Sequence, residues 1–386
     1  MLNFDFQNPT KLMFGQGRIA DIAGEIPKDA RVLITYGGGS VKKNGVLDQV
    51  KTALAGYHLT EFAGIEPNPL YETLLKAVDI VKSEKIDFLL ALGGGSVIDG
   101  TKFIACASCY QGDPWEIIFS RGTRINGALP LGVVLTLPAA GSESNHRAVV
   151  TRKSMNAKIS FYSTEIFPRF AVLDPTITYS LPPAQISNGV VDAYMHVLEQ
   201  YMTYPVNAKV QERFSEGLLL TLLEEGPKAL ADPLNYEVRS NIMLCATLAL
   251  NGFIGSGVPN DWATHMVGHE LTALYGIDHA CTLAVLMPGM LKVQKEDKRL
   301  RLLQYAERIW GLKDGDEDAV IDAAIDKTRQ FFETMQLKTR LSDYGLTAEN
   351  IPEILEHLKK HDMVRLGERK NVTPEVVRKV LELSLQ

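Results

Sequence analysis

The sequence lacks the features that mark membrane-spanning, secreted and nucleic-acid-binding proteins. No apolar run approaches the roughly 18 residues that a membrane-spanning helix needs. The opening segment MLNFDFQNPTKLMF has no signal-peptide pattern. The 40 lysines and arginines form no cluster and are outnumbered by 46 acidic residues, which gives a net charge of −6. We therefore expect no membrane or nucleic-acid partner and a cytoplasmic location.

Cysteine is also scarce, with four residues in 386, as expected in a reducing compartment. Cys106 and Cys109 form a C-x-x-C within a helical pattern, not at a helix start, where a redox pair would gain thiolate stabilisation. We interpret both as core residues rather than as a redox pair or metal ligands. Cys281 lies close to the histidine-rich segment described next, and it remains an alternative ligand there.

Three of the eight histidines lie within residues 261–281. His265 and His269 are four residues apart, so on a helix they share one face, roughly 6 Å apart along the axis. In a continuous helix His279 would lie about 21 Å from His265, too far to share a metal. We therefore predict that the helix ends near Gly276 and that His279 folds back towards His265.

A carboxylate to complete this site is found in NGVVDAYMHVLEQ, where Asp192 and His196 again have i, i+4 spacing in a helical pattern. One carboxylate with several imidazoles suits Fe(II) or Zn(II) and is too rich in imidazole for Mg or Ca. The alternative is that these histidines are ordinary core or surface residues. Two pairs at matching spacing favour the metal site.

A third histidine pair, His357 and His361, has the same spacing in the charged context LEHLKKHD. Lys359 and Lys360 would repel a cation, so we predict that both histidines face solvent.

The order of strand and helix patterns predicts two domains. Up to about residue 175, β-branched strands, small-residue turns and amphipathic helices alternate, which indicates a mostly parallel sheet with helices on both faces. After Leu181-Pro182-Pro183 the strand signals almost vanish. One long helical pattern is expected to end at Gly226-Pro227, and Thr373-Pro374 to open the last helix. We predict an α/β domain over 1–180 and an all-helical domain over 181–386.

Two GGGSV turns follow predicted strands. At 93–97, glycines let backbone N–H groups approach a phosphate, and the following helix N-terminus favours an anion there. The alternative is a tight turn that packs helix against strand. Asp99 is equally consistent with hydrogen bonding to ribose or nicotinamide and with stabilising the helix dipole.

The earlier turn, at 37–41, bears on cofactor choice. It contains no acid that could bind an adenosine ribose 2′-hydroxyl, whereas Ser40, Lys42 and Lys43 could bind a 2′-phosphate. This composition favours NADP over NAD. Exposed, solvated lysines are the alternative reading.

Taken together, these motifs resemble the iron-containing, or group III, alcohol dehydrogenase family. The resemblance spans essentially the whole chain and is carried by GGGSVID at 93–99, LPAAGSESN at 137–145, AVLDPTITYSLPP at 171–183, and the Asp192 and H-x-x-x-H motifs. YGGGSVKK, GIEPNP, DWATH and GHELTALYGIDHA are similar to its branch of NADPH-dependent aldehyde reductases and butanol dehydrogenases.

The resemblance implies a dinucleotide-binding α/β domain, a helical domain, a metal site in the cleft between them, and usually a homodimer. It implies that one divalent ion is bound by Asp192, His196, His265 and His279, with His269 close by and not bound to it. Because an imidazole near a cation can still be near its working pKa, we hypothesise that His269 delivers the proton or anchors a water relay. The residues that it implies for NADP(H) are Gly38, Ser40, Asn68, Gly94, Gly95, Ser96, Asp99, Thr136, Asn145 and Lys158. Relatives commonly have Thr where this chain has Ala140, so one hydroxyl contact to the cofactor is expected to be missing.

The function expected from this resemblance is reduction of short-chain aldehydes to primary alcohols by NADPH. A metal- and dinucleotide-dependent lyase of the same superfamily would need several basic residues for a phosphorylated substrate, and only Arg147 and Lys158 stand near the motifs. A nucleotide or metal sensor without turnover is the other alternative.

Overall fold

The computed structural model describes all 386 residues, which form two compact units. One comprises residues 7–182 with 233–247, and the other comprises 1–6, 183–232 and 248–386. The boundary at residue 180 between an α/β domain and a helical domain stays a prediction. The compact units differ from it because the N-terminal hexapeptide belongs to the helical unit and most of α8 (Tyr236–Ala249) belongs to the sheet unit.

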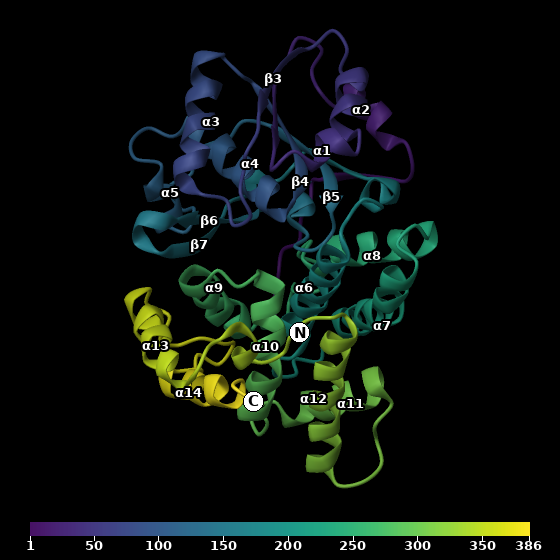
Figure 1. Cartoon of the computed structure of the whole chain (residues 1–386), viewed down its shortest axis with the longest axis vertical. Helices are drawn as coiled ribbons and strands as arrows, with labels where there is room; N and C mark the ends of the chain where they lie inside the picture. Colours follow the sequence, from purple (N-terminus) through teal and green to yellow (C-terminus); the bar gives the residue numbers. More distant parts are fainter. The chain divides into compact units, whose positions relative to one another are not determined.

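The sheet unit contains a six-stranded parallel sheet in the order β1-β8-β5-β4-β2-β3 (Figure 1). Its strands are β1 (Lys11–Phe14), β2 (Arg31–Tyr36), β3 (His58–Phe62), β4 (Phe88–Gly94), β5 (Leu131–Leu137) and β8 (Phe170–Leu173). The connecting helices are α1 (Ser40–Lys43), α2 (Val46–Ala53), α3 (Tyr71–Ser83), α4 (Gly95–Cys109) and α5 (Trp115–Phe119). The parallel sheet predicted from the sequence is confirmed.

Alternate residues of the strands face two separate cores. In β4, Leu89 and Ala91 pack with α3 and α4, whereas Phe88, Leu90 and Leu92 pack with α1 and α2 on the opposite face. Side chains of a strand point alternately to its two faces, and both faces here are covered, so the strand reads as a continuous apolar run. A short antiparallel pair, β6 (Arg147–Arg152) and β7 (Ala157–Tyr162), was not predicted.

Gly132 in β5 allows this sheet to pack closely. A Cβ atom at this position would lie 2.3 Å from Cζ of Phe170, its register neighbour on β8. Phe170 is buried and stacks on Phe88, so its ring has little room to move. We expect Gly132→Ala to lower the free energy of unfolding by about 1–3 kcal/mol. Urea denaturation would measure this loss.

The matched control is Gly24→Ala, because a Cβ atom at this exposed residue of the same unit would meet nothing within 4 Å. It should change the free energy of unfolding by no more than about 0.5 kcal/mol. Equal midpoints for the two variants would contradict the packing argument.

The second unit is helical, as predicted. Its helices are α6 (Pro183–Tyr201), α7 (Lys209–Ala231), α9 (Ala263–Tyr275), α10 (His279–Val293), α11 (Arg299–Trp310), α12 (Glu317–Thr334), α13 (Ile351–Lys360) and α14 (Pro374–Leu383). The buried helix α10 packs against α6, α9, α12 and α14. None of the helices has the length and apolar character needed to cross a membrane.

One helix end was predicted wrongly. Helix α7 continues through Gly226 and Pro227 to Ala231. A Cβ atom at Gly226 would lie 2.8 Å from Cγ1 of Val190 on α6, so this glycine allows two helices to pack closely and does not end one. The prediction for the last helix is confirmed, with Thr373 at the N-cap and Pro374 at the first position.

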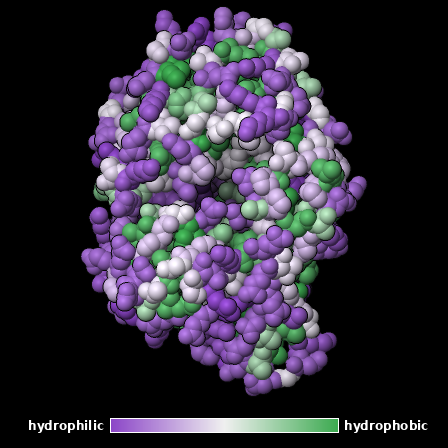
Figure 2. Space-filling model, viewed as in Figure 1, coloured by the Kyte–Doolittle hydropathy of each residue, from purple (hydrophilic) through white to green (hydrophobic).

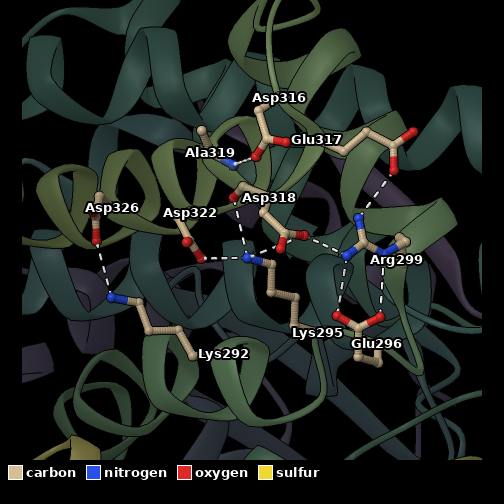
Figure 3. Close-up of polar contacts among 10 residues, drawn as sticks. All are labelled: Lys292, Lys295, Glu296, Arg299, Asp316, Glu317, Asp318, Ala319, Asp322 and Asp326. Atoms are coloured by element: carbon tan, nitrogen blue, oxygen red, sulfur yellow. Dashed lines mark hydrogen bonds and ion pairs between the residues drawn. The ribbon is translucent and has the colours of Figure 1, made fainter.

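Partly exposed ion pairs join α10 and α11 to α12 (Figure 3). Lys292 pairs with Asp326 at 3.5 Å, and Arg299 pairs with Glu317 at 3.0 Å. Asp316 caps α12 by accepting a hydrogen bond from the backbone N–H of Ala319. Exposed pairs of this kind contribute little to stability. On the face shown in Figure 2, hydrophobic residues form small patches separated by hydrophilic ones.

Candidate functional site

Asp192 and His196 lie one turn apart on α6, in a stretch that is buried from Val190 to Tyr201. Only 6% of Asp192 and 5% of His196 is exposed. A buried carboxylate is costly unless it is compensated, so its surroundings are informative.

The predicted helix break at Gly276 is confirmed. Helix α9, which carries His265, ends at a left-handed Gly276 with φ 68°, and α10 begins at His279 after the N-cap residue Asp278. A left-handed conformation is cheapest for glycine, because it has no Cβ atom. The break allows His279 to turn back, so that the His265 and His279 ring centroids are 5.2 Å apart.

Three imidazoles surround one carboxylate oxygen. Oδ1 of Asp192 lies 3.7 Å from Nδ1 of His196, 4.0 Å from Nε2 of His265 and 3.8 Å from Nε2 of His279. This oxygen is buried and accepts no hydrogen bond. A tetrahedral ion with bonds of about 2.0–2.1 Å spaces its ligands roughly 3.4 Å apart. The residues therefore fit a divalent metal after small adjustments.

The four predicted ligands are not equally close to one another. Donor atoms of Asp192, His265 and His279 all lie within 4.8 Å of each other. His196 adjoins this group through Asp192 and through His265, whose ring centroid is 4.7 Å away. His269 is buried and its ring is 5.1 Å from that of His279, beside the group but outside it.

Glu199 positions His265 and was missed in the sequence. Its Oε1 accepts the backbone N–H of Thr264 at 2.7 Å, its Oε2 accepts that of His265 at 3.2 Å, and its carboxylate also contacts Nδ1 of the His265 ring. Burial, with the nearby charge of Asp261, raises the pKa of Glu199 to about 8. An Nδ1–H donated to Glu199 would leave Nε2, the nitrogen that faces Asp192, able to bind a metal. The signal was available: Glu199 follows His196 by three residues on the same helix.

Replacing Glu199 by Gln should weaken metal binding about 10–100-fold, since groups that orient a metal-ligating histidine typically contribute that much. Competition with a chromophoric chelator measures the affinity. Glu307→Gln is the matched control on an exposed face of α11 and should leave the affinity unchanged. Equal affinities for the Glu199 variant and the parent would contradict the orienting role.

The turn between β4 and α4 has the predicted strand-turn-helix form. A Cβ atom at Gly93 would lie 2.5 Å from Val97, and one at Gly94 would lie 2.9 Å from Leu137. Close packing therefore explains these two glycines without a ligand. Ser96 accepts a hydrogen bond from the backbone N–H of Asn68, so two residues predicted to bind the cofactor lie side by side.

Asp99 is engaged within the protein, because its two oxygens accept hydrogen bonds from the Ser142 hydroxyl at 2.6 Å and the Val149 N–H at 2.9 Å. Its side chain ties α4 to β6 and to the loop that precedes β6. Burial raises the pKa of this carboxyl, and the nearby Lys102 charge opposes the shift.

Lys102 was also missed. Its fully buried ammonium donates to the Ser142 hydroxyl at 3.0 Å, to Oδ1 of Asn145 at 3.0 Å and to the carbonyl of Arg147 at 2.8 Å. Burial lowers the pKa of Lys102 to about 8. It fixes the loop that contains Asn145, while Thr136 and Lys158, also predicted to line the cofactor, are buried on β5 and β7. The signal for it was a lysine one turn after Asp99 in a helix whose other residues are mostly small or apolar.

The turn at 37–41 carries exposed Gly38 and Ser40 at the start of α1. The fold brings an acid close to it from β3: Glu61 accepts a hydrogen bond from the Tyr36 hydroxyl at 2.6 Å. Glu61 also pairs with Lys51 at 2.5 Å and lies 3.9 Å from Lys42. Its charge is thus compensated within the protein, which lowers its pKa.

Two minor predictions need correction. His357 and His361 are largely covered and turn towards the protein, because both contact the buried Glu270. Cys106 is a buried core residue as expected, but Cys109 is exposed. The Cys281 thiol donates towards Asn188 at 3.8 Å and lies outside the group of metal-ligating atoms.

Comparison with known proteins matches both parts of the chain to one family. Residues 9–175 match the family described as iron-containing alcohol dehydrogenase, and residues 186–385 match its C-terminal part. The chain is 57% identical over 384 residues to the NADPH-dependent aldehyde reductase YqhD of Escherichia coli, with 99% of each chain covered. It is 40% identical to a probable NADH-dependent butanol dehydrogenase of Bacillus subtilis over the full length of both. The crystal structure of Escherichia coli YqhD superposes with a TM-score of 0.99 at 56% identity, covering 100% of this chain and 99% of that one.

Proposed function

The chain belongs to the iron-containing alcohol dehydrogenase family, and we propose from its site that it reduces short-chain aldehydes to primary alcohols with NADPH. The observation that carries the proposal is the convergence of three imidazoles on the buried Oδ1 of Asp192. Such a site needs a divalent cation, and an aldehyde reductase of this family uses one together with NADP(H). The ligand set accepts Fe(II) and Zn(II).

We propose that Asp192, His196, His265 and His279 hold the ion. When both cofactors are bound, the ion supplies Lewis acidity to the carbonyl oxygen and NADPH supplies the hydride. The chain supplies positioning: α6 and the α9–α10 break fix the ligands, and Glu199 fixes the tautomer of His265.

We propose that His269 delivers the proton to the developing alcohol. It is buried beside His279 and is not part of the ligand group, so its imidazole can hold a proton there. His269→Ala should lower kcat and retain metal, whereas His265→Ala should lose both. A His269→Ala variant with unchanged kcat would assign this residue a packing role only.

The cofactor-binding residues are proposed in two groups. Most of them lie at or after the carboxyl ends of the parallel strands β2, β3, β4 and β5, whereas Lys158 lies near the start of β7. The first group would bind the pyrophosphate and nicotinamide side, and consists of Asn68, Gly94, Gly95, Ser96, Asp99, Thr136, Asn145 and Lys158. Gly38 and Ser40 would bind the 2′-phosphate. Ala140 lies beside this turn, since a Cβ atom built at Gly95 would lie 3.1 Å from Cβ of Ala140. Because Ala140 has no hydroxyl, we expect one contact to the cofactor to be missing and the cofactor affinity to be lower.

The identity to an NADPH-dependent aldehyde reductase favours this function over the lyase and sensor alternatives. We also propose that the protein acts as a homodimer, as the family resemblance implies, and that it lies in the cytoplasm, as expected from the sequence.

The test is direct: metal-loaded protein is mixed with NADPH and butanal, and absorbance at the reduced-nicotinamide band is followed. We expect consumption of NADPH, and slower consumption of NADH. No consumption with metal fully loaded would favour a sensor, and consumption that requires a sugar phosphate would favour a lyase-type relative.

A further inference from the structure

A second cluster of metal-ligating side chains lies between α9 and α13. Glu270 on α9 is 1% exposed and faces His357 and His361, which are one turn apart at the end of α13. Oε2 of Glu270 lies 3.3 Å from Nδ1 of His357, and Oε1 lies 2.8 Å from Nδ1 of His361. The ligand atoms of all three residues lie within 4.8 Å of one another.

The cluster has the chemistry of a transition-metal site. Two imidazoles and one carboxylate form a mixed nitrogen and oxygen set that Zn(II) and Fe(II) accept. The two ring centroids are 5.6 Å apart, and Nδ1 of each ring contacts the same carboxylate, so both nitrogens point towards Glu270. With one ligand atom from each residue, all three atoms lie within 4.8 Å of one another, so small movements would bring them to the roughly 3.4 Å spacing of ligands around a tetrahedral ion.

An ion could reach this cluster from solvent. The sequence had suggested that Lys359 and Lys360 would repel a cation there. The side chains of His357 and His361 are 15% and 11% exposed, so the cluster borders solvent while Glu270 closes its inner side. Lys359 and Lys360 are exposed. Lys359 is two residues from each histidine and points away from their shared face, whereas Lys360 is three residues after His357 and borders that face with an exposed side chain that can extend into solvent.

We propose that Glu270, His357 and His361 form a second divalent-metal site that takes Zn(II) and joins α13 to α9. Three protein ligands leave a fourth position for water. Because α9 also carries His265, an ion here would restrain the helix that supports the first site. Its expected role is to stabilise the helical unit, since an ion bound only by the folded state raises stability by mass action.

The experiment is a Zn(II) titration of the chelator-stripped full chain, with thermal unfolding followed in parallel. The parent protein should bind about two equivalents, and His361→Gln about one, with a smaller Zn(II)-dependent rise in Tm. His357→Gln is a second variant that should behave in the same way. His58→Gln changes an exposed histidine on β3 and should still bind about two equivalents.

Activity separates this site from the first. His361→Gln should retain NADPH-dependent butanal reduction within about a factor of two, because it does not touch the first site. Asp192→Asn should lose the Zn(II) of the first site and keep the Zn(II) bound by Glu270, His357 and His361. The proposal would be overturned if the parent protein bound one equivalent of Zn(II) and His361→Gln had the same stoichiometry and the same Tm response. Glu270 and the two histidines would then form only an ion pair within the protein. These stoichiometries do not depend on whether butanal is reduced, so failure of the proposed function would be seen separately.

Discussion

Asp192→Asn should lower kcat for butanal reduction by on the order of 10³-fold, because the interaction of a Lewis acid with the carbonyl oxygen contributes several kcal/mol. Oδ1 of Asp192 is the atom on which His196, His265 and His279 converge. The amide has almost the same shape but no charge, so it binds a dication weakly and leaves three imidazoles to hold the ion. Metal content and kcat should fall together, and high external Zn(II) or Fe(II) should restore part of both.

The matched control is Asp326→Asn. This carboxylate belongs to the exposed pair with Lys292 shown in Figure 3, and its side chain is 54% exposed. The same chemical change there should leave kcat and metal content unaltered and shift stability by no more than about 0.5 kcal/mol. An Asp192→Asn variant that keeps full metal content and kcat would contradict the assignment of Asp192 as a ligand.

Ser40→Asp should lower kcat/KM for NADPH about 100-fold and change that for NADH little, since a like charge facing a ligand charge costs several kcal/mol. Ser40 is exposed at the start of α1, and Gly38 beside it has open space where a side chain would lie. The carboxylate would repel a 2′-phosphate and could accept hydrogen bonds from a ribose 2′-hydroxyl. Steady-state kinetics with both cofactors measures the preference.

Ser40→Asn separates charge from shape, because it has the size of Asp and no charge. It should lower kcat/KM for NADPH by less than about 10-fold. Equal losses with the two cofactors in the Asp variant would show that residue 40 does not contact the 2′-phosphate. The Bacillus subtilis relative named for NADH makes this comparison informative, because related chains differ in cofactor.

The parallel sheet and the break before His279 could be predicted because each depends on local chemistry. Strands buried on both faces need continuous apolar runs, as in β4, and Gly276 adopts the left-handed conformation that ends α9. The i, i+4 spacings pointed to Asp192, His196 and His265 for the same reason, since helical periodicity places residues four apart on one face, although His269 lies outside the group of metal-ligating atoms.

Other features depend on contacts between distant segments. Gly226 reads as a helix end, yet it lies inside α7 because Val190 on α6 requires a residue without a side chain there. The lysines around His357 and His361 suggested a solvated face, but Glu270 lies 87 residues before His357, and no local pattern joins them. Glu61 likewise reaches the 37–41 turn only through the pairing of β3 with β2.

The polar residues that hold the site were missed for a related reason. Glu199 and Lys102 sit in helices whose other residues are mostly apolar, and their partners come from later segments of the chain. Burial of a charged group is a strong sign of a specific partner, but the sequence does not tell which partner it has. Glu199 holds a proposed metal ligand and Lys102 holds the loop with Asn145, so a search for ligands alone passed over both.

Anomalous X-ray diffraction at the zinc edge, from crystals of Zn(II)-loaded protein, tests the ligand assignment most directly. A peak is predicted within bonding distance, about 2.0–2.2 Å, of Asp192, His196, His265 and His279. Its absence from this position in crystals that contain Zn(II), or a peak bound by other residues in its place, would contradict the assignment of these four side chains as ligands.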